Sequence, residues 1–287
     1  MNKNYFKKRK LNSHKGDYGH LFIIGGSPGL TGAVCLSGIS ALRSGCGLVT
    51  IGIPESLNNI IETKLTEVMS KPFPETNQHT FSLKSVSPVL EFIEEKADGV
   101  VIGPGISLNT ETGKFVKEII KRITKPLVID ADAIKLISLE IEILKNLKTK
   151  AILTPHPGEM SFLIKKDVHQ IQKQRVFFAK NFAKEYGLIL VLKGYKTIVT
   201  DGKNVYINKT GNPGMATAGT GDVLSGIIGS FLVQGIEPFI SAKMAVYIHG
   251  LAGDFAKKIK GEISLIASDI IDFLPEVFKK LRGNRKT

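Results

Sequence analysis

The sequence predicts an α/β fold in which a mainly parallel sheet is covered by helices on both faces and carries an antiparallel edge. Short runs of Val, Ile and Leu alternate with longer stretches of helical spacing, and such continuous apolar strands are typical of parallel sheets buried on both sides. These runs end in glycine or polar residues, and ligands bind at the carboxyl ends of parallel strands. No linker-like shift in composition divides the chain, so we expect one domain over residues 1–287 with basic terminal tails.

The amino-terminal part predicts a strand, a glycine loop and a helix, in that order. Residues 21–24 are apolar, residues 25–33 are rich in glycine, and residues 34–42 carry apolar side chains at helical spacing. A second strand is predicted at residues 48–54, after glycines have ended the helix. Residues 64–87 show no clear pattern, and we expect them to form a loose excursion.

Four further apolar runs predict strands that end in polar loops. They span residues 100–102, 127–129, 151–153 and 188–192. Residues 197–207 hold two short β-rich segments around Asp-Gly-Lys, which predicts a hairpin and hence the antiparallel edge. The groups that follow the four runs are Gly103-Pro104-Gly105, Asp130-Ala131-Asp132, Thr154-Pro155-His156-Pro157-Gly158-Glu159 and Lys193-Gly194.

Residues 211–226 are the most informative stretch, because a glycine turn opens a helix there. Backbone N–H groups at a helix start are unpaired and carry partial positive charge, so Gly219, Thr220 and Gly221 predict a receptor for phosphate oxygens. Asp222 follows directly, and a carboxylate beside phosphates is repulsive unless it takes a proton from a hydroxyl or helps to hold a metal. Capping of the helix is the alternative role for this residue.

Missing sequence patterns disfavour several enzyme classes. The chain lacks the Walker glycine loop, the Gly-x-Gly-x-x-Gly of dinucleotide-binding folds and the Gly-x-Ser-x-Gly of many hydrolases, and its histidines show no metal-ligand spacing. What remains is a backbone anion cradle, one carboxylate and strand-end loops able to hold a second ligand. These are the groups that phosphoryl transfer requires in an enzyme without a P-loop.

The composition indicates which classes of ligand the protein binds and in which compartment it lies. The net charge of +13 suits anionic small molecules such as nucleotides, while no basic stripe interleaved with aromatic residues predicts a specific nucleic-acid partner. Basic residues gather near both ends, in residues 7–10 and 279–286. The two cysteines lack zinc or disulfide spacing and the apolar runs are short, so we expect a cytoplasmic protein without membrane association.

An ordered series of motifs resembles the ADP/ATP-dependent NAD(P)H-hydrate dehydratases of the ribokinase-like superfamily. The resemblance covers residues 14–275 and implies a ribokinase-like three-layer sandwich. It also implies a repair reaction in which ADP or ATP, with Mg²⁺, phosphorylates the hydroxyl of hydrated NADH or NADPH (the S epimer), and phosphate then leaves. In chain order the motifs are His14-Lys15-Gly16, Gly25-Gly26-Ser27 with Thr31-Gly32-Ala33, Gly103-Pro104-Gly105, Asp130-Ala131-Asp132-Ala133, Thr154-Pro155-His156-Pro157-Gly158-Glu159, Asn212-Pro213-Gly214-Met215-Ala216 and Gly219-Thr220-Gly221-Asp222.

The resemblance implies roles for residues at matching positions. Asp222 would be the base that takes the proton from the hydrate hydroxyl, and Ala33, Gly105 and His156 would contact the hydrate with it. The family carries a small residue after Lys-Gly where this chain has Tyr195-Lys196, which leaves the detailed nucleotide contacts open. The adenine nucleotide would be held by Lys193, Gly194, Tyr195, Lys196, Thr197, Gly219, Thr220 and Gly221.

Plainer roles remain open for some of these residues. Ala33 also suits an ordinary helix position, Gly105 a turn, and Lys193 the end of a strand. His156, between two prolines, also suits a rigid loop histidine.

Three further polar residues have open roles. Asp130 and Asp132 either bind Mg²⁺ through water or cap the helix that follows them. His249 lies on an apolar helix face, which favours a structural role.

Two other functions remain open. A ribokinase-like kinase acting on a vitamin precursor such as hydroxyethylthiazole or pyridoxal would share the glycine turn and Asp222, and the charge also suits a nucleotide-binding protein without enzymatic activity. The resemblance implies a homo-oligomer, with a tetramer as one form. Many relatives carry a preceding epimerase domain, but only about a dozen residues precede the first motif here, so we expect the epimerase to be a separate protein of the same pathway.

Overall fold

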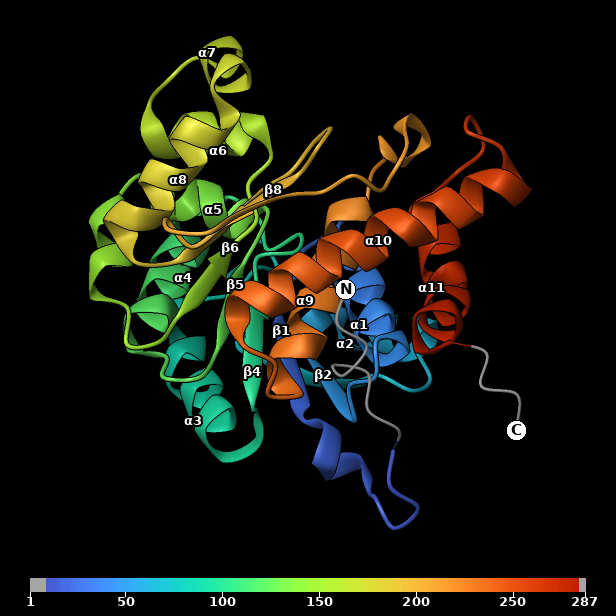
Figure 1. Ribbon diagram of the computed structural model, residues 1–287. Coiled ribbons are helices and arrows are strands. Elements are labelled where there is room, and N and C mark those ends of the chain that lie inside the picture. Colours follow the sequence, from blue (N-terminus) through green and yellow to red (C-terminus); the bar gives the residue numbers. More distant parts are fainter. Residues whose placement is uncertain (1–8, 284–287) are drawn as a thin grey trace.

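A nine-stranded sheet organises the computed structural model, which describes residues 9–283 (Figure 1). The strand order is β3-β2-β1-β4-β5-β6-β7-β8-β9, with every pair parallel from β3 to β7 and antiparallel pairs at β7–β8 and β8–β9. The predicted parallel sheet with an antiparallel edge is therefore confirmed. The strands are β1 (His20–Ile24), β2 (Leu48–Pro54), β3 (Met69–Phe73), β4 (Gly99–Ile102), β5 (Leu127–Ile129), β6 (Ala151–Leu153), β7 (Ile189–Leu192), β8 (Ile198–Thr200) and β9 (Val205–Ile207).

The central strands bury both faces because their apolar side chains point alternately to two cores. In β1, Leu21 and Ile23 pack into one core, while Phe22 and Ile24 pack into the other. A strand with no polar face must be covered on both sides, which explains the continuous apolar runs in the sequence.

Helices form a layer over each face of the sheet (Figure 1). The layer beside Leu21 and Ile23 contains α1 (Thr31–Arg43), α2 (Asn58–Lys64), α9 (Thr220–Val233), α10 (Pro238–Lys260) and α11 (Ala267–Arg282). The opposite layer contains α3 (Val86–Lys96), α4 (Thr110–Arg122), α5 (Asp132–Ser138), α6 (Pro157–Ile164), α7 (Val168–Lys173) and α8 (Arg175–Tyr186). Short 3₁₀ helices lie at Lys15–Tyr18, Glu55–Leu57, Leu83–Ser85, Ile141–Asn146 and Pro213–Met215.

Residues 64–87 correct one expectation, because they are not a loose excursion throughout. They contain β3, which pairs with β2 in parallel from Met69 opposite Thr50 to Phe73 opposite Pro54. Of the five residues in β3 only Phe73 is buried, so this edge strand lacks the apolar run that marks the central strands. Pro72 lies in the same strand, and proline is tolerated at a sheet edge.

Helix α9 is fixed at the centre of its layer. Every residue from Val223 to Val233 is buried, and the glycines let neighbours approach closely: a Cβ added at Gly226 would lie 2.1 Å from the Ser37 carbonyl oxygen of α1. A Cβ at Gly229 would lie 2.7 Å from a methyl group of Val101 in β4. The middle of α9 is thereby held against both the sheet and α1.

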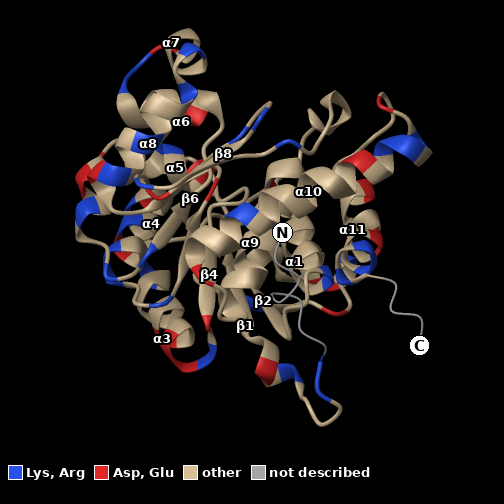
Figure 2. Ribbon diagram, in the orientation of Figure 1, with Lys and Arg blue, Asp and Glu red and all other residues tan. Residues whose placement is uncertain are grey.

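Charged residues are distributed over the outer helices. Figure 2 shows both signs interspersed along α3 and α11, while the central strands β4 to β7 carry none. The basic stretches predicted at the two ends lie partly outside the described residues, in residues 1–8 and 284–287. Within residues 9–283, no helix is both long enough and apolar enough to cross a membrane.

Candidate active site

The start of α9 leaves its N–H groups open. Its N-cap is Gly219, which has no side chain to accept a hydrogen bond and takes a left-handed φ of 87°. A Cβ there would lie 2.5 Å from a methyl group of Leu36, so the turn needs glycine for its conformation and for its space. Asp222 is the third residue of the helix and makes no capping hydrogen bond, so the capping role considered for it is wrong.

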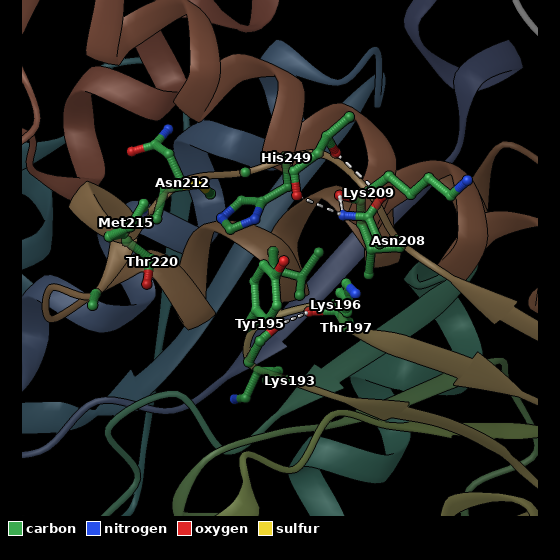
Figure 3. A pocket seen from close by; sticks show the side chains of 18 of the residues that line it. Lys193, Tyr195, Lys196, Thr197, Asn208, Lys209, Asn212, Met215, Thr220 and His249 are labelled. Atoms are coloured by element: carbon green, nitrogen blue, oxygen red, sulfur yellow. Dashed lines mark hydrogen bonds between the residues drawn. The ribbon is translucent and has the colours of Figure 1, made fainter. Parts of the chain in front are cut away.

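A cavity of about 710 Å³ opens beside this turn (Figure 3). Four parts of the chain surround it: the loop after β7, the segment after β9, and the facing sides of α9 and α10. Of the residues predicted to hold a nucleotide, all but Gly219 line it. These are Lys193, Gly194, Tyr195, Lys196, Thr197, Thr220 and Gly221.

Two carboxylates that share one lysine form an acidic cluster next to the turn. The Lys193 ammonium is 2.9 Å from Asp130 Oδ1 and 3.7 Å from a carboxylate oxygen of Glu159. Thr154 donates a second hydrogen bond to Asp130 Oδ1, at 2.6 Å. Asp130 Oδ2 is buried and has no hydrogen-bond partner among residues 9–283. A Cβ on Gly221 would lie 3.3 Å from the Lys193 ammonium, which places this cation between the cluster and the turn.

Burial shifts the proton affinity of these groups. It raises the pKa of Asp222 to about 7, with a further contribution from the negative charge of Asp130. Burial also raises the pKa of Glu159 to about 7. The pKa of Lys193 is raised although burial alone would lower it, because Asp130 and Glu159 stabilise its charge. Asp222 is therefore a carboxylate able to exchange a proton near neutral pH.

Two small residues predicted to contact the hydrate lie side by side. Gly105 takes a left-handed φ of 59°, and a Cβ there would lie 2.7 Å from the Leu30 carbonyl oxygen and 3.3 Å from the Ala33 side chain. Ala33 is one turn before Leu36, which touches Gly219. The pair thus lies on the α1 side of the turn.

His156 is the N-cap of α6. Its Nδ1 accepts the Glu159 N–H at 3.2 Å, and the Glu159 carboxylate accepts the His156 N–H at 2.8 Å. Because Nδ1 accepts, the neutral ring carries its proton on Nε2. Half of the side chain is exposed, and burial of the rest lowers the pKa of His156. The ring is a neutral hydrogen-bond donor at the crevice.

The two aspartates after β5 do not cap α5. The N-cap is Ala131, without a side-chain hydrogen bond, so the capping role considered for both is wrong. Asp132 instead accepts the Ser107 N–H at 3.2 Å and lies 3.8 Å from the Lys135 ammonium. Within residues 9–283, no cluster of three or more His, Cys, Asp or Glu side chains could hold a metal directly.

Two residues at the site escaped sequence reasoning. Glu159 belongs to a recognised motif, but its contact with Lys193 joins residues from two strand ends and carries no sequence signal. His249 was assigned a structural role, yet it lines the cavity, and its Nε2 is buried without a hydrogen-bond partner among the described residues. Burial lowers the pKa of His249 to about 4.

Residues 21–276 match the family model described as NAD(P)H-hydrate dehydratase. The chain belongs to this family. It is 34% identical, over 92% of its length and 86% of the relative's, to the ADP-dependent (S)-NAD(P)H-hydrate dehydratase of Neisseria meningitidis. It is 42% identical to the bifunctional NAD(P)H-hydrate repair enzyme Nnr of Moorella thermoacetica, over 98% of this chain and 53% of that protein. The chain thus spans about half the length of several curated relatives it matches.

A solved structure agrees in fold with the family assignment. The ADP/ATP-dependent NAD(P)H-hydrate dehydratase of Bacillus subtilis, co-crystallised with ATP and Mg²⁺, has a TM-score of 0.83 and 29% identity, covering 97% of this chain and 95% of that one. The hydroxyethylthiazole kinase of Pyrococcus horikoshii, at 19% identity and a TM-score of 0.62, shares the fold. The ribokinase-like architecture is therefore shown.

Proposed function

We propose that this chain uses ADP or ATP to dehydrate the S epimer of hydrated NADH or NADPH back to the dihydronicotinamide. The observation that carries the proposal is the position of Asp222. This carboxylate directly follows the open turn, and a nucleotide-sized cavity lies beside that turn. The charges of the acidic cluster act on the pKa of Asp222. A phosphoryl donor and a hydroxyl can meet at this point.

In the first half-reaction Asp222 takes the proton of the hydrate hydroxyl. The hydroxyl oxygen attacks the terminal phosphorus of the nucleotide, and the bond to the leaving phosphate oxygen breaks. The open N–H groups of the turn and the Lys193 ammonium stabilise the charge on the transferring group. A base with a pKa near the working pH is suited to this proton transfer.

In the second half-reaction the carbon–oxygen bond to the new phosphate breaks and phosphate leaves with the bonding electrons. The adjacent ring carbon gives a proton to the departing phosphate, and its C–H electrons form the double bond. Hydrate and ATP thus give dihydronicotinamide, ADP and phosphate. His156 Nε2–H, Ala33 and Gly105 are proposed to hold the hydrate during both steps.

The nucleotide is proposed to lie in the cavity. Its phosphates would meet the turn formed by Gly219, Thr220 and Gly221, with its nucleoside toward the loop after β7. Tyr195 is 87% exposed, so it can cover a bound nucleoside without breaking packing in the ligand-free chain. The nucleotide-binding set of this loop is Lys193, Gly194, Tyr195, Lys196 and Thr197.

The acidic cluster fits a magnesium ion held largely through water and nucleotide phosphates. Asp130 Oδ2 is a buried oxygen donor without a partner among residues 9–283, and Asp132 follows two residues later. When bound, Mg²⁺ neutralises phosphate charge during transfer.

The test is recovery of NADH absorbance when hydrated NADH is supplied with Mg²⁺ and either ADP or ATP. Recovery with one of the nucleotides is expected, and no recovery with both would contradict the proposal. A stable phosphorylated alcohol from a vitamin precursor, in place of free phosphate, would establish the kinase alternative. Nucleotide binding without turnover of any hydrate would establish the non-enzyme alternative.

We also propose that residues 1–287 act as one domain in a cytoplasmic homo-oligomer, with a tetramer as the form to test by light scattering. A separate epimerase is proposed to convert the unreactive hydrate epimer. Faster recovery of a mixed-epimer hydrate when an epimerase is added would support that partnership.

A further inference from the structure

Arg175 is a partly buried cation with no carboxylate partner among residues 9–283. It begins α8, and its Nε is buried without a hydrogen-bond partner in the described chain. Its Nη2 donates to the carbonyl oxygens of Leu192 at 3.0 Å and Lys193 at 3.1 Å, and its Nη1 donates to Gln172 Oε1 at 2.8 Å. Taking a guanidinium out of water is costly, and arginine normally offsets that with an anion. Here a single nitrogen of the guanidinium, Nη2, is directed at two backbone carbonyls instead.

Those carbonyls lie where β7 ends. The Lys193 N–H donates to the Pro155 carbonyl oxygen at 2.8 Å, so this peptide is held from one side by the loop after β6 and from the other by Arg175. Gly194 follows with a left-handed φ of 123°, and a Cβ there would lie 3.2 Å from Arg175 Nη1. Arg175 therefore fixes the direction in which the Lys193 side chain leaves the strand.

The position of that side chain matters because it reaches three groups at once. The Lys193 ammonium contacts Asp130 and Glu159, and it lies close to Gly221. Its charge also acts on Asp222. A backbone shift at the end of β7 would move the single cation that pairs with both buried carboxylates in the described chain.

We infer that Arg175 is a positioning residue that acts through Lys193, holding its ammonium between the acidic cluster and the phosphate-binding turn. The inference rests on the proposed function. It assigns a part in the reaction to α8, none of whose residues lines the cavity.

A double-mutant cycle tests the inference. Arg175→Lys keeps the charge but loses the planar guanidinium, whose Nη2 bonds both carbonyls while Nη1 is held by Gln172. We expect kcat/KM for the hydrate to fall about tenfold. In a Lys193→Met background the same change should lower kcat/KM less than about twofold, because the group it positions is gone. An equal fold-loss in both backgrounds would overturn the inference. Lys180→Arg, an exposed change on the same helix, is the matched control and should match wild type.

The pH profile of kcat/KM supplies a readout that a merely structural role would not move. The charges acting on Asp222 are those of Asp130, Lys193, Asp132 and Glu159, of which only Lys193 favours the ionised form. Arg175→Lys should therefore shift the acidic limb to higher pH, in the same direction as Lys193→Met. A loss of equal size at every pH would contradict the inference.

Gln172→Ala keeps the test decisive if Arg175→Lys fails to fold. Gln172 is exposed, and its removal deletes one bond to the guanidinium while leaving the core intact. A smaller shift of the acidic limb in the same direction is expected, and an unchanged profile would count against the inference. Failure of the proposed function is distinguishable, because the wild-type chain would then show no hydrate turnover at all.

Discussion

Helices α4 and α9 begin in opposite ways. At α4 the Asn109 side chain accepts the N–H groups of Glu111 at 2.8 Å and Thr112 at 3.2 Å, so the helix start is closed by its own sequence. At α9 the N-cap is Gly219, which offers no acceptor, and a cavity lies beside the open N–H groups. The first arrangement serves stability, whereas the second keeps hydrogen-bonding capacity for a ligand.

The two starts also place a carboxylate differently. Glu111, in the first turn of α4, is half-buried and accepts the N–H of Leu83. The pKa of Asp222, in the first turn of α9, is raised to about 7 by burial and then by the negative charge of Asp130. The same residue class at a similar helix position is a tether in one case and a candidate base in the other.

The largest effect is expected from Asp222→Asn. The amide cannot accept the hydroxyl proton, so kcat should fall by about 10²- to 10⁴-fold, while nucleotide affinity should change little because the turn is intact. Steady-state kinetics and nucleotide titration measure the two quantities. Glu111→Gln at α4 is the matched control and should leave kcat unchanged. Turnover of Asp222→Asn close to wild type would show that Asp222 does not act as the base.

Gly219→Ala would break the open helix start itself. The added Cβ meets Leu36 and forces a left-handed φ on alanine, so the turn must shift, and nucleotide affinity should fall about tenfold or more. Isothermal titration with ADP and ATP checks this. Gly32→Ala is the control, because nothing lies within 4 Å of a Cβ there, and unchanged affinity is expected. Equal affinities in both variants would show that the turn does not hold the nucleotide.

The pH dependence of kcat/KM should show an acidic limb near pH 7. Asp222 acts as a base only when ionised, and its pKa is raised to about 7, so the rate should fall as the pH drops through that value. The measurement is a buffer series with nucleotide and Mg²⁺ saturating. A flat profile from pH 5 to 8 would show that Asp222 is not the base.

Sequence reasoning reached the fold because it depends on local pattern. The continuous apolar runs at β4 to β7 predict burial of both faces of these strands, and the hairpin pattern predicts the antiparallel edge. It failed at β3, whose side chains are mostly exposed, since an edge strand needs no apolar run.

Sequence reasoning reached the open turn but not its surroundings. Gly219 and Asp222 are adjacent in the chain, so their spacing is legible in the sequence. Contact between Lys193 and Asp130 joins residues 63 positions apart, and the part taken by Arg175 depends on two backbone carbonyls that no side-chain pattern encodes. Such contacts depend on which strands become neighbours, and the strand order is known only from the folded sheet.

The smallest effect on turnover is expected from Asn109→Ala, which opens the start of α4. Loss of the two capping hydrogen bonds should lower the free energy of unfolding by about 1 kcal/mol and leave kcat and KM unchanged. Urea denaturation and the hydrate assay measure the two sides. No residue of α4 lines the cavity beside α9, so we expect an opened helix start there to gain no nucleotide site. Altered nucleotide affinity in this variant would contradict the assignment of the α4 start to stability and of the α9 start to nucleotide binding.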